Sequence, residues 1–425
     1  MRIIYLHQYF NTPDMSGGSR SYEIAKRLVS LGHTVHMITS WRDNREFDCN
    51  FQTNVEGIFV YWIPVPYSNN MGFWERIRAF LVFAVKSARI AIRLKADLIF
   101  ASSTPLTIAF PAVYASRRQN IPMVFEIRDL WPEMPIAIGS LKNPLFKLLA
   151  KLLERWTYRN AMALIALSPG IKEGILRLGY PNSCIAVIPN GCNIKTFSTS
   201  RRAGQLLRSQ RDWLGSKPLL IYAGTMGKVN KVDYMVALAL ELYKLNSNVQ
   251  ILLVGDGNEK EKFISKAKLH NVFEKNLFVE SSLPKDMMPA LFSACTMSSN
   301  LVIDLPQARA NSANKFFDTL AAGKPIFLNH GGWMYDLVEN YKCGINAWGR
   351  PIKEVALLLD QRLNDANWLN SASISASNLA RTFFDYDTLA LQFEKVLIAT
   401  FQGHPERSSY FAPGDYKSNH FEQTF

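Results

Sequence analysis

Cysteine and metal-ligand patterns are sparse in this chain. Its five cysteines are scattered, odd in number and without a C-x-x-C pair, which predicts neither a disulfide framework nor a zinc site. The seven histidines are isolated or flank a predicted strand, so they do not form a metal-ligand motif. We therefore expect a reducing compartment and no bound metal.

Long hydrophobic segments are also missing. Met1 and Arg2 lead directly into a short apolar run, which is too short for the core of a secretory signal peptide. The longest uncharged stretch, 98–116, carries polar residues and two prolines, which favours a buried strand, turn and helix over a membrane span. These two features predict a cytoplasmic protein.

Length, apolar residues and positive charge are abundant. The 425 residues are 48% apolar, which is enough for two hydrophobic cores. The 48 Lys+Arg outnumber the 35 Asp+Glu, and a net charge of +13 suits nucleic acid, an anionic membrane or phosphorylated substrates. There is no basic patch interleaved with aromatic residues, so we expect no nucleic-acid partner. Motifs of P-loop enzymes and of G-x-S-x-G hydrolases are absent as well.

Strand-like and helix-like segments alternate along the first half. The predicted strands are Arg2–Leu6, Thr34–Thr39, Ile58–Val65, Leu98–Ala101, Met123–Glu126, Ala163–Leu167 and Ile185–Ile188. Such alternation predicts a mostly parallel sheet covered on both faces, with ligands at the carboxyl ends of the strands. We expect Ser19 to cap the first helix, which should end near Gly32.

A second domain is predicted by the restart of the same alternation. After Gly191 the chain is polar and basic through Arg211, as in a linker or the entry to a new domain. New strands are then expected at Leu219–Ala223, Gln250–Val254, Leu277–Glu280, Thr296–Leu301 and Pro325–Leu328. The predicted fold class is α/β with two Rossmann-like domains. We expect one domain over 1–190 and a second over 191–385. A C-terminal helix over 386–402, with a return to the first domain as one option, and a flexible tail over 403–425 complete the organisation.

Two glycine turns are candidates for phosphate contact. Gly17 and Gly18 lie between a strand and a helix start, where backbone N–H groups and the helix dipole favour an anion. The turn A-G-T-M-G-K, 223–228, follows the first strand of the second domain and adds Lys228, with Lys231 nearby. Two such turns would clamp one diphosphate. The alternative is two ordinary turns with solvated lysines.

Two further segments carry charged side chains at positions suited to chemistry. Arg128, Asp129 and Glu133 follow an apolar strand, where catalytic groups would stand, although ordinary ion pairs are the alternative. In residues 311–325, Asp318 lies one turn after Asn314 and Lys315 on one helix face. A carboxylate there would accept hydrogen bonds from ribose hydroxyls, with Lys315 facing phosphate or sugar; a capped, solvated helix is the alternative.

Two segments read as basic amphipathic helices. Residues 71–95 combine apolar positions at helical spacing with six basic residues against one glutamate, which suits an anionic lipid surface. Residues 144–158 repeat this pattern with leucines and three basic residues. Because most amphipathic helices only cover their own core, we expect membrane contact more for the first segment than for the second.

Taken in order, these segments resemble retaining glycosyltransferases of family 4. The motifs are the loop with Gly17 and Gly18, R-D-L-W-P-E, I-P-N-G, Y-A-G-T-M-G-K, V-G-D-G and N-K-F-F-D with L-A-A-G-K-P. The opening H-Q-Y-F-N-T-P-D-M-S-G-G-S-R-S-Y-E is similar to WbuB-type O-antigen and capsule enzymes. The resemblance spans about residues 1–400 and implies the GT-B architecture, in which two Rossmann-like domains face each other across a cleft.

The resemblance also implies site residues. It assigns the donor diphosphate to Gly17, Gly18, Gly224, Thr225 and Lys228, with Lys231 a less certain contact, and it assigns the ribose to Asp318. Asn314 and Lys315 join this donor set, and Glu133 is the acceptor candidate. The resemblance thus implies an acceptor-binding, membrane-facing domain over 1–190 and a nucleotide-sugar-binding domain over 191–385. Ala310 stands where the family often has a glutamate, and Arg128 stands where many relatives have a histidine before Asp129.

The expected reaction is a metal-independent transfer, without a cofactor, that retains the anomeric configuration. Lys228 and glycine N–H groups would stabilise the departing diphosphate, and Asp129 is the candidate base. The resemblance points to a UDP-linked amino or deoxyamino sugar, such as N-acetyl-fucosamine, and to a polyprenyl diphosphate-linked saccharide. The enzyme would work in O-antigen or capsule synthesis on the anionic inner face of the cytoplasmic membrane.

Two other function classes remain open from the sequence. A nucleotide-sugar epimerase or hydrolase can share the two-domain shape, although its acid-base pairs are not visible. A noncatalytic, membrane-associated nucleotide-sugar-binding protein would explain the alanine at position 310. Turnover with and without an acceptor separates these possibilities.

Overall fold

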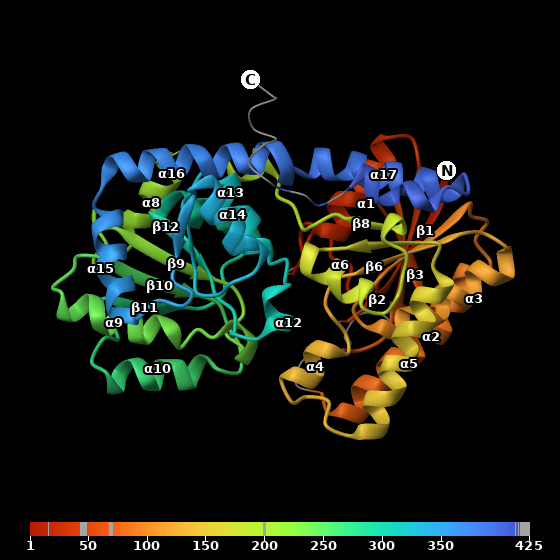
Figure 1. Cartoon of the computed structure of the whole chain (residues 1–425), viewed down its shortest axis with the longest axis horizontal. Coiled ribbons are helices and arrows are strands. Elements are labelled where there is room, and N and C mark those ends of the chain that lie inside the picture. Colours follow the sequence, from red (N-terminus) through yellow and green to blue (C-terminus); the bar gives the residue numbers. More distant parts are fainter. Residues whose placement is uncertain are drawn as a thin grey trace. The chain divides into compact units, whose positions relative to one another are not determined.

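The computed structural model describes residues 1–15, 17–42, 49–67, 71–198, 201–412, 414 and 416. They form two compact units. The first unit comprises Met1–Pro189, residues 310–312 and Tyr386–Asp415, and the second comprises Asn190–Arg309, Ala313–Asp385 and the chain from Tyr416. Figure 1 labels the helices and strands of both units.

The first unit is built on an eight-stranded sheet with the order β3-β4-β2-β1-β5-β6-β7-β8. Only the edge strand β3 is antiparallel to its neighbour. Successive crossovers run outward in both directions from β1, so the junction of β1 and β5 is the point where strand order reverses. The strands are β1 (Arg2–Leu6), β2 (Thr34–Trp41), β3 (Phe51–Val55), β4 (Ile58–Pro64), β5 (Leu98–Ser102), β6 (Met123–Ile127), β7 (Ala163–Ala166) and β8 (Ile185–Val187).

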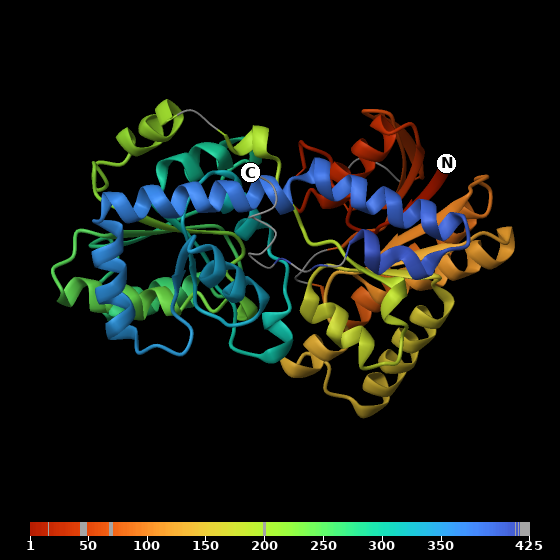
Figure 2. The ribbon, with the colours of Figure 1, turned by 45° about the horizontal axis from the view of Figure 1, so that its top comes forward.

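Helices cover both faces of this sheet. They are α1 (Arg20–Ser30), α2 (Phe73–Ala91), α3 (Ala109–Gln119), α4 (Glu133–Ala137), α5 (Pro144–Asn160), α6 (Pro169–Leu176), α17 (Tyr386–Phe401) and α18 (Ser408–Phe411). Figures 1 and 2 show α2, α3 and α5 together on one flank of the unit. On the other face, α17 packs beside α1 and places Phe393 edge-on against Phe100 of β5, with ring centroids 4.8 Å apart.

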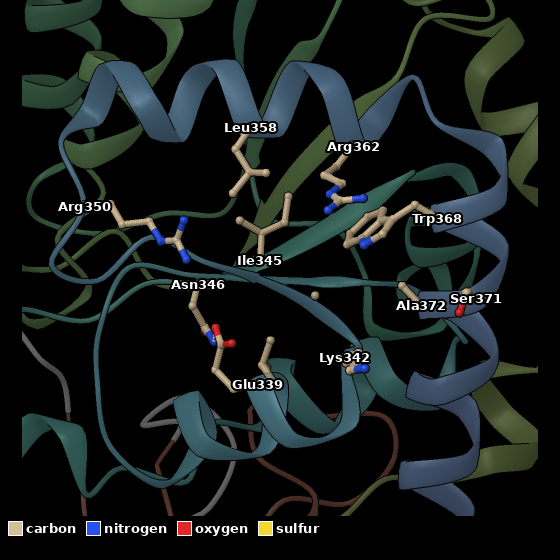
Figure 3. Close-up of a pocket in the computed structure, with 12 residues that line it drawn as sticks. Glu339, Lys342, Ile345, Asn346, Arg350, Leu358, Arg362, Trp368, Ser371 and Ala372 are labelled. Atoms are coloured by element: carbon tan, nitrogen blue, oxygen red, sulfur yellow. Dashed lines mark hydrogen bonds between the residues drawn. The ribbon is translucent and has the colours of Figure 1, made fainter.

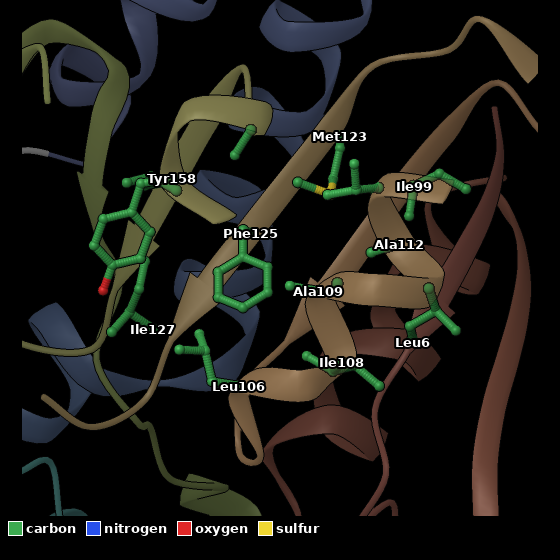
Figure 4. Packing of buried hydrophobic residues seen from close by; sticks show 14 of the residues in the cluster. Leu6, Ile99, Leu106, Ile108, Ala109, Ala112, Met123, Phe125, Ile127 and Tyr158 are labelled. Atoms are coloured by element: carbon green, nitrogen blue, oxygen red, sulfur yellow. The ribbon is translucent and has the colours of Figure 1, made fainter. Parts of the chain in front are cut away.

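The core of the first unit lies between the strands and these helices. Figure 4 shows Leu6, Ile99 and Phe125, from three neighbouring strands, packed against Leu106 and Ala109 at the start of α3. These side chains are fully or almost fully buried. The stretch around residues 98–116 is therefore a strand, a turn and a helix, as predicted, because its apolar residues are needed on both sides of a buried parallel strand.

The second unit contains a six-stranded, fully parallel sheet with the order β11-β10-β9-β12-β13-β14. Numbered within the unit this is the 3-2-1-4-5-6 order of a doubly wound dinucleotide-binding fold, with its reversal between β9 and β12. The strands are β9 (Leu219–Ala223), β10 (Gln250–Val254), β11 (Leu277–Glu280), β12 (Met297–Asn300), β13 (Ile326–Leu328) and β14 (Gly344–Asn346). The helices are α7 (Ile194–Phe197), α8 (Arg201–Ser209), α9 (Tyr234–Lys244), α10 (Lys260–Leu269), α11 (Met288–Ala294), α12 (Pro306–Arg309), α13 (Asn314–Ala321), α14 (Trp333–Tyr341), α15 (Ile352–Leu363) and α16 (Ala366–Leu379).

Two strands were not predicted. β3 alternates weakly and exposes its three central polar residues, because it is an antiparallel edge strand. β14 has only three residues and also lies at an edge. Both lack the continuous apolar run by which the central strands were recognised.

The expected linker and the expected tail are partly helical instead. Helix α8 lies within the polar stretch taken as a linker, and it packs so closely on α11 that a Cβ at Gly204 would lie 2.7 Å from backbone atoms there. In the tail, α18 is followed by Ala412, whose carbonyl accepts a hydrogen bond of 2.7 Å from Val187 N of β8. These segments are helical because a few buried side chains, such as Leu207 and Ala412, anchor otherwise polar stretches. Helix α8 belongs to the second unit, as the alternative of a domain entry predicted. Residues 413, 415 and those after 416 lie outside the described part.

Candidate active site

The first glycine turn joins β1 to α1 and is held by Asn11. The buried Asn11 side chain donates from Nδ2 to the carbonyl of Gly18 at 3.2 Å and accepts from Arg42. Gly17 has φ +125°, and a Cβ there would lie 2.6 Å from Asn11 Nδ2. Only glycine therefore fits at position 17. Ser19 makes no capping side-chain bond, contrary to the prediction.

Behind this turn lies a fully buried ion pair. Arg20, the first residue of α1, donates from Nε to Glu126 of β6 at 2.9 Å. Arg20 also donates to the carbonyls of Ile188 and Pro189, while Glu126 accepts from Ser102 Oγ of β5. The pair thus joins the start of α1 to the ends of three strands. Burial of two charges is tolerated only because hydrogen bonds satisfy both groups.

Arg128 follows β6 and is positioned by a neutral histidine. Its backbone N–H donates to Ser103 Oγ at 3.1 Å, and its Nη1 lies 3.2 Å from His7 Nε2. Burial, reinforced by the charge of Arg128, lowers the pKa of His7 to about 3. The uncharged His7 accepts from Arg128 at Nε2 and donates from Nδ1 to the carbonyl of Ser102, 3.4 Å away.

The two carboxylates predicted beside Arg128 differ in their surroundings. Asp129 is exposed, yet desolvation by the surrounding protein raises the pKa of its carboxyl, with Arg128 acting in the opposite direction. Glu133 begins α4 and is paired with Arg177, at 3.1 Å between Oε2 and Nη2. Glu133 therefore takes part in an ordinary surface ion pair, because α4 and the end of α6 bring the two side chains together.

The second glycine turn follows β9 and is held by backbone packing. Gly224 has φ +143°, and its N–H donates to Val254 at the end of β10 at 2.9 Å. A Cβ at Gly255 would lie 2.0 Å from the Gly224 carbonyl oxygen, and one at Gly257 would lie 2.4 Å from that of Met226. The V-G-D-G segment therefore needs its glycines so that two backbones can touch.

The other predicted residues of this turn are exposed. Thr225, Lys228 and Lys231 all face solvent, and Tyr222 donates from its hydroxyl to the Thr225 carbonyl at 2.7 Å. Lys231 adopts the left-handed conformation with φ +46° at the end of a short turn, Lys228–Asn230. Within the described residues, neither lysine forms an ion pair with a carboxylate. Both charges are thus available to an anion.

Helix α13 brings Lys315 to this turn. The Lys315 Nζ lies 3.9 Å from the centre of the Tyr222 ring, and a Cβ at Gly224 would lie 3.0 Å from it. Burial lowers the pKa of Lys315 to about 7. The ring face partly compensates the desolvated cation. A nearly buried, readily titrating amine therefore stands beside the second glycine turn.

Asn314 and Asp318 share this helix. Asn314 is its first residue rather than its cap, and the Oδ1 atom is buried without a hydrogen-bond partner. Asp318 is half-buried one turn further on. The carboxylate position Ala310 is a buried methyl group whose carbonyl accepts from Ser168 Oγ.

The predicted residues thus form two sets. In the first unit, the turn at Gly17 follows β1, which flanks the point of order reversal, and Arg128 follows β6, which is separated from β1 by β5. In the second unit, Gly224 and Lys315 follow β9 and β12, which flank the corresponding point, and they touch. Sequence reasoning missed His7 and the buried Arg20–Glu126 pair. A glutamate inside the apolar strand M-V-F-E-I was the available signal, because such a charge requires a buried partner.

No described group of histidine, cysteine, aspartate and glutamate side chains could hold a metal ion. Nor does any described helix combine the length and apolarity that a membrane span requires.

Comparison with known proteins finds a family match in the first unit. The family model named glycosyl transferase 4-like domain matches residues 17–191, a segment that begins at the first glycine turn and ends after β8. Across more of the chain, the alpha-monoglucosyldiacylglycerol synthase of Acholeplasma laidlawii is 22% identical over 333 residues, or 75% of this chain and 77% of the relative.

Solved structures show the fold of the whole chain. Sucrose-phosphate synthase from Thermosynechococcus elongatus superimposes with a TM-score of 0.77 at 15% identity, covering 95% of this chain and 99% of that one. Anabaena Alr3699/HepE, solved in complex with UDP and glucose, has a TM-score of 0.69 at 18% identity, with 93% and 99% covered. The chain has the GT-B fold of two Rossmann-like domains, as predicted. Together with the match to the glycosyl transferase 4-like domain, these similarities support glycosyltransferase activity with a nucleotide-sugar donor.

Proposed function

We propose that the chain transfers a sugar from a UDP-linked donor to a polyprenyl diphosphate-linked saccharide, as a WbuB-type enzyme of O-antigen or capsule synthesis. The sugar is an amino or deoxyamino sugar such as N-acetyl-fucosamine. The reaction retains the anomeric configuration and uses no metal. The observation that carries the proposal is the contact between the glycine turn after β9 and Lys315 of α13.

The donor diphosphate binds at this contact. Backbone N–H groups near Gly224 and Thr225 meet the phosphates, and Lys315 supplies charge at close range, with Lys228 and Lys231 at the rim. A diphosphate beside Lys315 favours its protonated form, which burial otherwise opposes. The free Oδ1 atom of Asn314 accepts a hydrogen bond from the donor, and Asp318 holds the ribose hydroxyls.

The acceptor reacts in the first unit, near the end of β6. Arg128, fixed by the neutral His7, stabilises negative charge, and Gly17 and Gly18 contribute backbone N–H groups. Asp129 is the carboxylate available to take a proton from the acceptor hydroxyl, because its raised pKa makes it a stronger base than an ordinary aspartate. Glu133 is paired with Arg177, so it contacts the acceptor only where the acceptor also contacts Arg177.

Helix α5 contacts the lipid carrier through apolar residues that are exposed to solvent. Its buried side chains include Glu154, Thr157 and Tyr158, and burial raises the pKa of Glu154 to about 7. On the outer side, Leu145, Leu148, Leu149 and Leu152 are 50 to 59% exposed. An exposed apolar row beside basic residues is typical of a helix that lies in an anionic membrane surface. A relative named for a diacylglycerol product is consistent with a lipid-linked acceptor.

One assay separates the three function classes. Purified protein in EDTA is incubated with UDP- and GDP-sugars and polyprenyl diphosphate-GlcNAc, and mass spectrometry follows nucleotide release and lipid-linked product. Product that requires the acceptor supports the transferase. Equal donor consumption without acceptor favours an epimerase or hydrolase. Tight UDP binding in calorimetry without any turnover across the panel favours a noncatalytic binding protein.

A matched pair of variants tests the membrane contact. Leu148→Ser/Leu152→Ser on α5 and Leu81→Ser/Val85→Ser on α2 each remove two exposed apolar side chains one turn apart. Because burying such side chains is worth about 1 kcal/mol or more each, we expect the α5 variant to bind anionic phosphatidylglycerol vesicles at least tenfold more weakly. Equal effects of the two variants, or none, would contradict an α5-centred contact.

A further inference from the structure

The second unit contains a cavity at the β14 edge of its sheet. The cavity has a volume of 420 Å³ and is lined by β14, α14, α15 and the start of α16 (Figure 3). This volume lies in the range of small-molecule sites. None of its lining residues belongs to the donor set, which follows β9 and β12 instead.

Three cations line this cavity against one carboxylate. Lys342 ends α14, Arg350 lies in the following loop and Arg362 comes from α15. Within the described residues none of the three forms an ion pair. The carboxylate, Glu339, is held by Asn346 Nδ2 at 2.6 Å. The cavity therefore has an excess of positive charge that the protein does not neutralise.

The two arginines are arranged for an oxyanion. Figure 3 shows Arg350 and Arg362 entering from two sides, with their guanidinium groups turned toward Ile345 on β14. The Arg362 guanidinium lies over the Trp368 ring, 5.5 Å from its centre, which fixes its plane and leaves its N–H edge for an acceptor. Planar guanidinium groups match phosphate oxygens in paired hydrogen bonds.

Uncharged polar groups also lie beside the three cations of the cavity. Asn346 is 3% exposed, and its Oδ1 atom has no partner. Ser371 offers a hydroxyl at the mouth, and Ile345 and Leu358 form an apolar wall. Because the Asn346 Oδ1 atom is buried, the Ser371 hydroxyl is the group that a ligand hydroxyl can reach from the cavity.

We propose that this cavity binds a small phosphorylated metabolite that carries hydroxyl groups, of the size of a sugar phosphate. The phosphate contacts Arg350, Arg362 and Lys342, and a ligand hydroxyl forms a hydrogen bond with the Ser371 hydroxyl. The site is separate from the donor site, so ligand binding here and UDP binding do not compete.

Calorimetry with the full-length protein tests this site, using glucose 6-phosphate as the probe and inorganic phosphate as the comparison, each with and without UDP. We expect glucose 6-phosphate to bind more tightly than phosphate, with an affinity that UDP does not abolish. Arg350→Gln/Arg362→Gln should weaken binding at least tenfold. Lys285→Gln/Lys353→Gln, which removes the same charge from exposed positions outside the cavity lining, should change it less than threefold.

A second variant tests the site in case the protein with both arginines replaced does not fold. Ser371 is exposed, so Ser371→Asp should leave the fold intact while adding a negative charge at the mouth, and binding should weaken several-fold. Competition by UDP, equal losses in the two charge pairs, an unchanged affinity in Ser371→Asp or the absence of any binding would each overturn the proposal.

Discussion

The two glycine turns occupy equivalent places in the two units but are held in opposite ways. The turn after β1 is held by side chains, with Asn11 bonded to Gly18 and a buried Arg20–Glu126 pair behind it. The turn after β9 is held by backbone against backbone, with Gly255 pressed against Gly224. The turn after β1 is therefore held by charged side chains that are already paired, whereas the turn after β9 is held without charged side chains.

This difference predicts where an anionic donor gains its electrostatic stabilisation. In the first unit, Arg20 is paired with Glu126 and Arg42 is bonded to Asn11. Around the second turn, Lys315 lies close to the glycines, and no described carboxylate is paired with it. We therefore expect the second unit to supply most of the charge for the diphosphate and the first to supply shape.

The largest expected effect is on the side-chain-held turn. Arg20→Met leaves Glu126 buried and uncompensated, which should lower stability by about 3–5 kcal/mol. Arg27→Met on the same helix breaks the pairs with Glu23 and Asp387 nearer the surface and a contact with the Tyr386 ring, and should cost about 1 kcal/mol. Urea unfolding of both variants gives the comparison. Similar losses would mean that the buried pair does not anchor the turn.

Replacing glycine by alanine compares the two constructions directly. Gly255→Ala forces a Cβ against a backbone carbonyl that cannot move aside, and should cost about 3 kcal/mol. Gly17→Ala meets the end of the Asn11 side chain, which can shift, and should cost about 1–2 kcal/mol. Thermal unfolding measures both, with Gly227→Ala as a control in open, negative-φ backbone. A reversed order would contradict the distinction between the turns.

Lys315 provides the test for charge in the second turn. Lys315→Met should weaken UDP binding by about 2 kcal/mol, or roughly 30-fold, because a charge-assisted contact is lost. Lys262→Met on α10, which removes a lysine paired with Glu259, should leave the affinity unchanged. Calorimetry at pH 7 measures both, and an equal effect would place the main charge elsewhere.

The smallest expected effect is a pH dependence. Because the pKa of the free Lys315 is about 7, the amine is charged below pH 7 and loses its proton above it, so UDP binding must be accompanied by proton uptake. The affinity for UDP should fall by about tenfold in total, or 1.4 kcal/mol, between pH 7 and pH 9. In Lys315→Arg the fall should disappear. A wild-type affinity that is independent of pH over this range would exclude Lys315 as the titrating contact.

Helices α2 and α5 show what the spacing of apolar residues along the sequence does not predict. Both segments have apolar and basic residues at helical spacing, and residues 71–95 were expected to be the better membrane helix. In the structure α2 buries Phe83 and Ala84 and exposes Leu81 and Val85, and α5 exposes four of its leucines and buries Glu154. A 3.6-residue period specifies that a helix has two faces but not which face meets the rest of the protein.

The sequence by itself determined the alternation of strands and helices, the long buried strands and the places of both glycine turns, because these follow from local patterns of three to ten residues. The tertiary structure decided which distant groups meet: Arg20 with Glu126, His7 with Arg128, and Lys315 with Gly224. It also fixed the short edge strands β3 and β14 and the cavity beside β14. These features depend on burial and on sheet order, which arise only when segments far apart in the chain pack together.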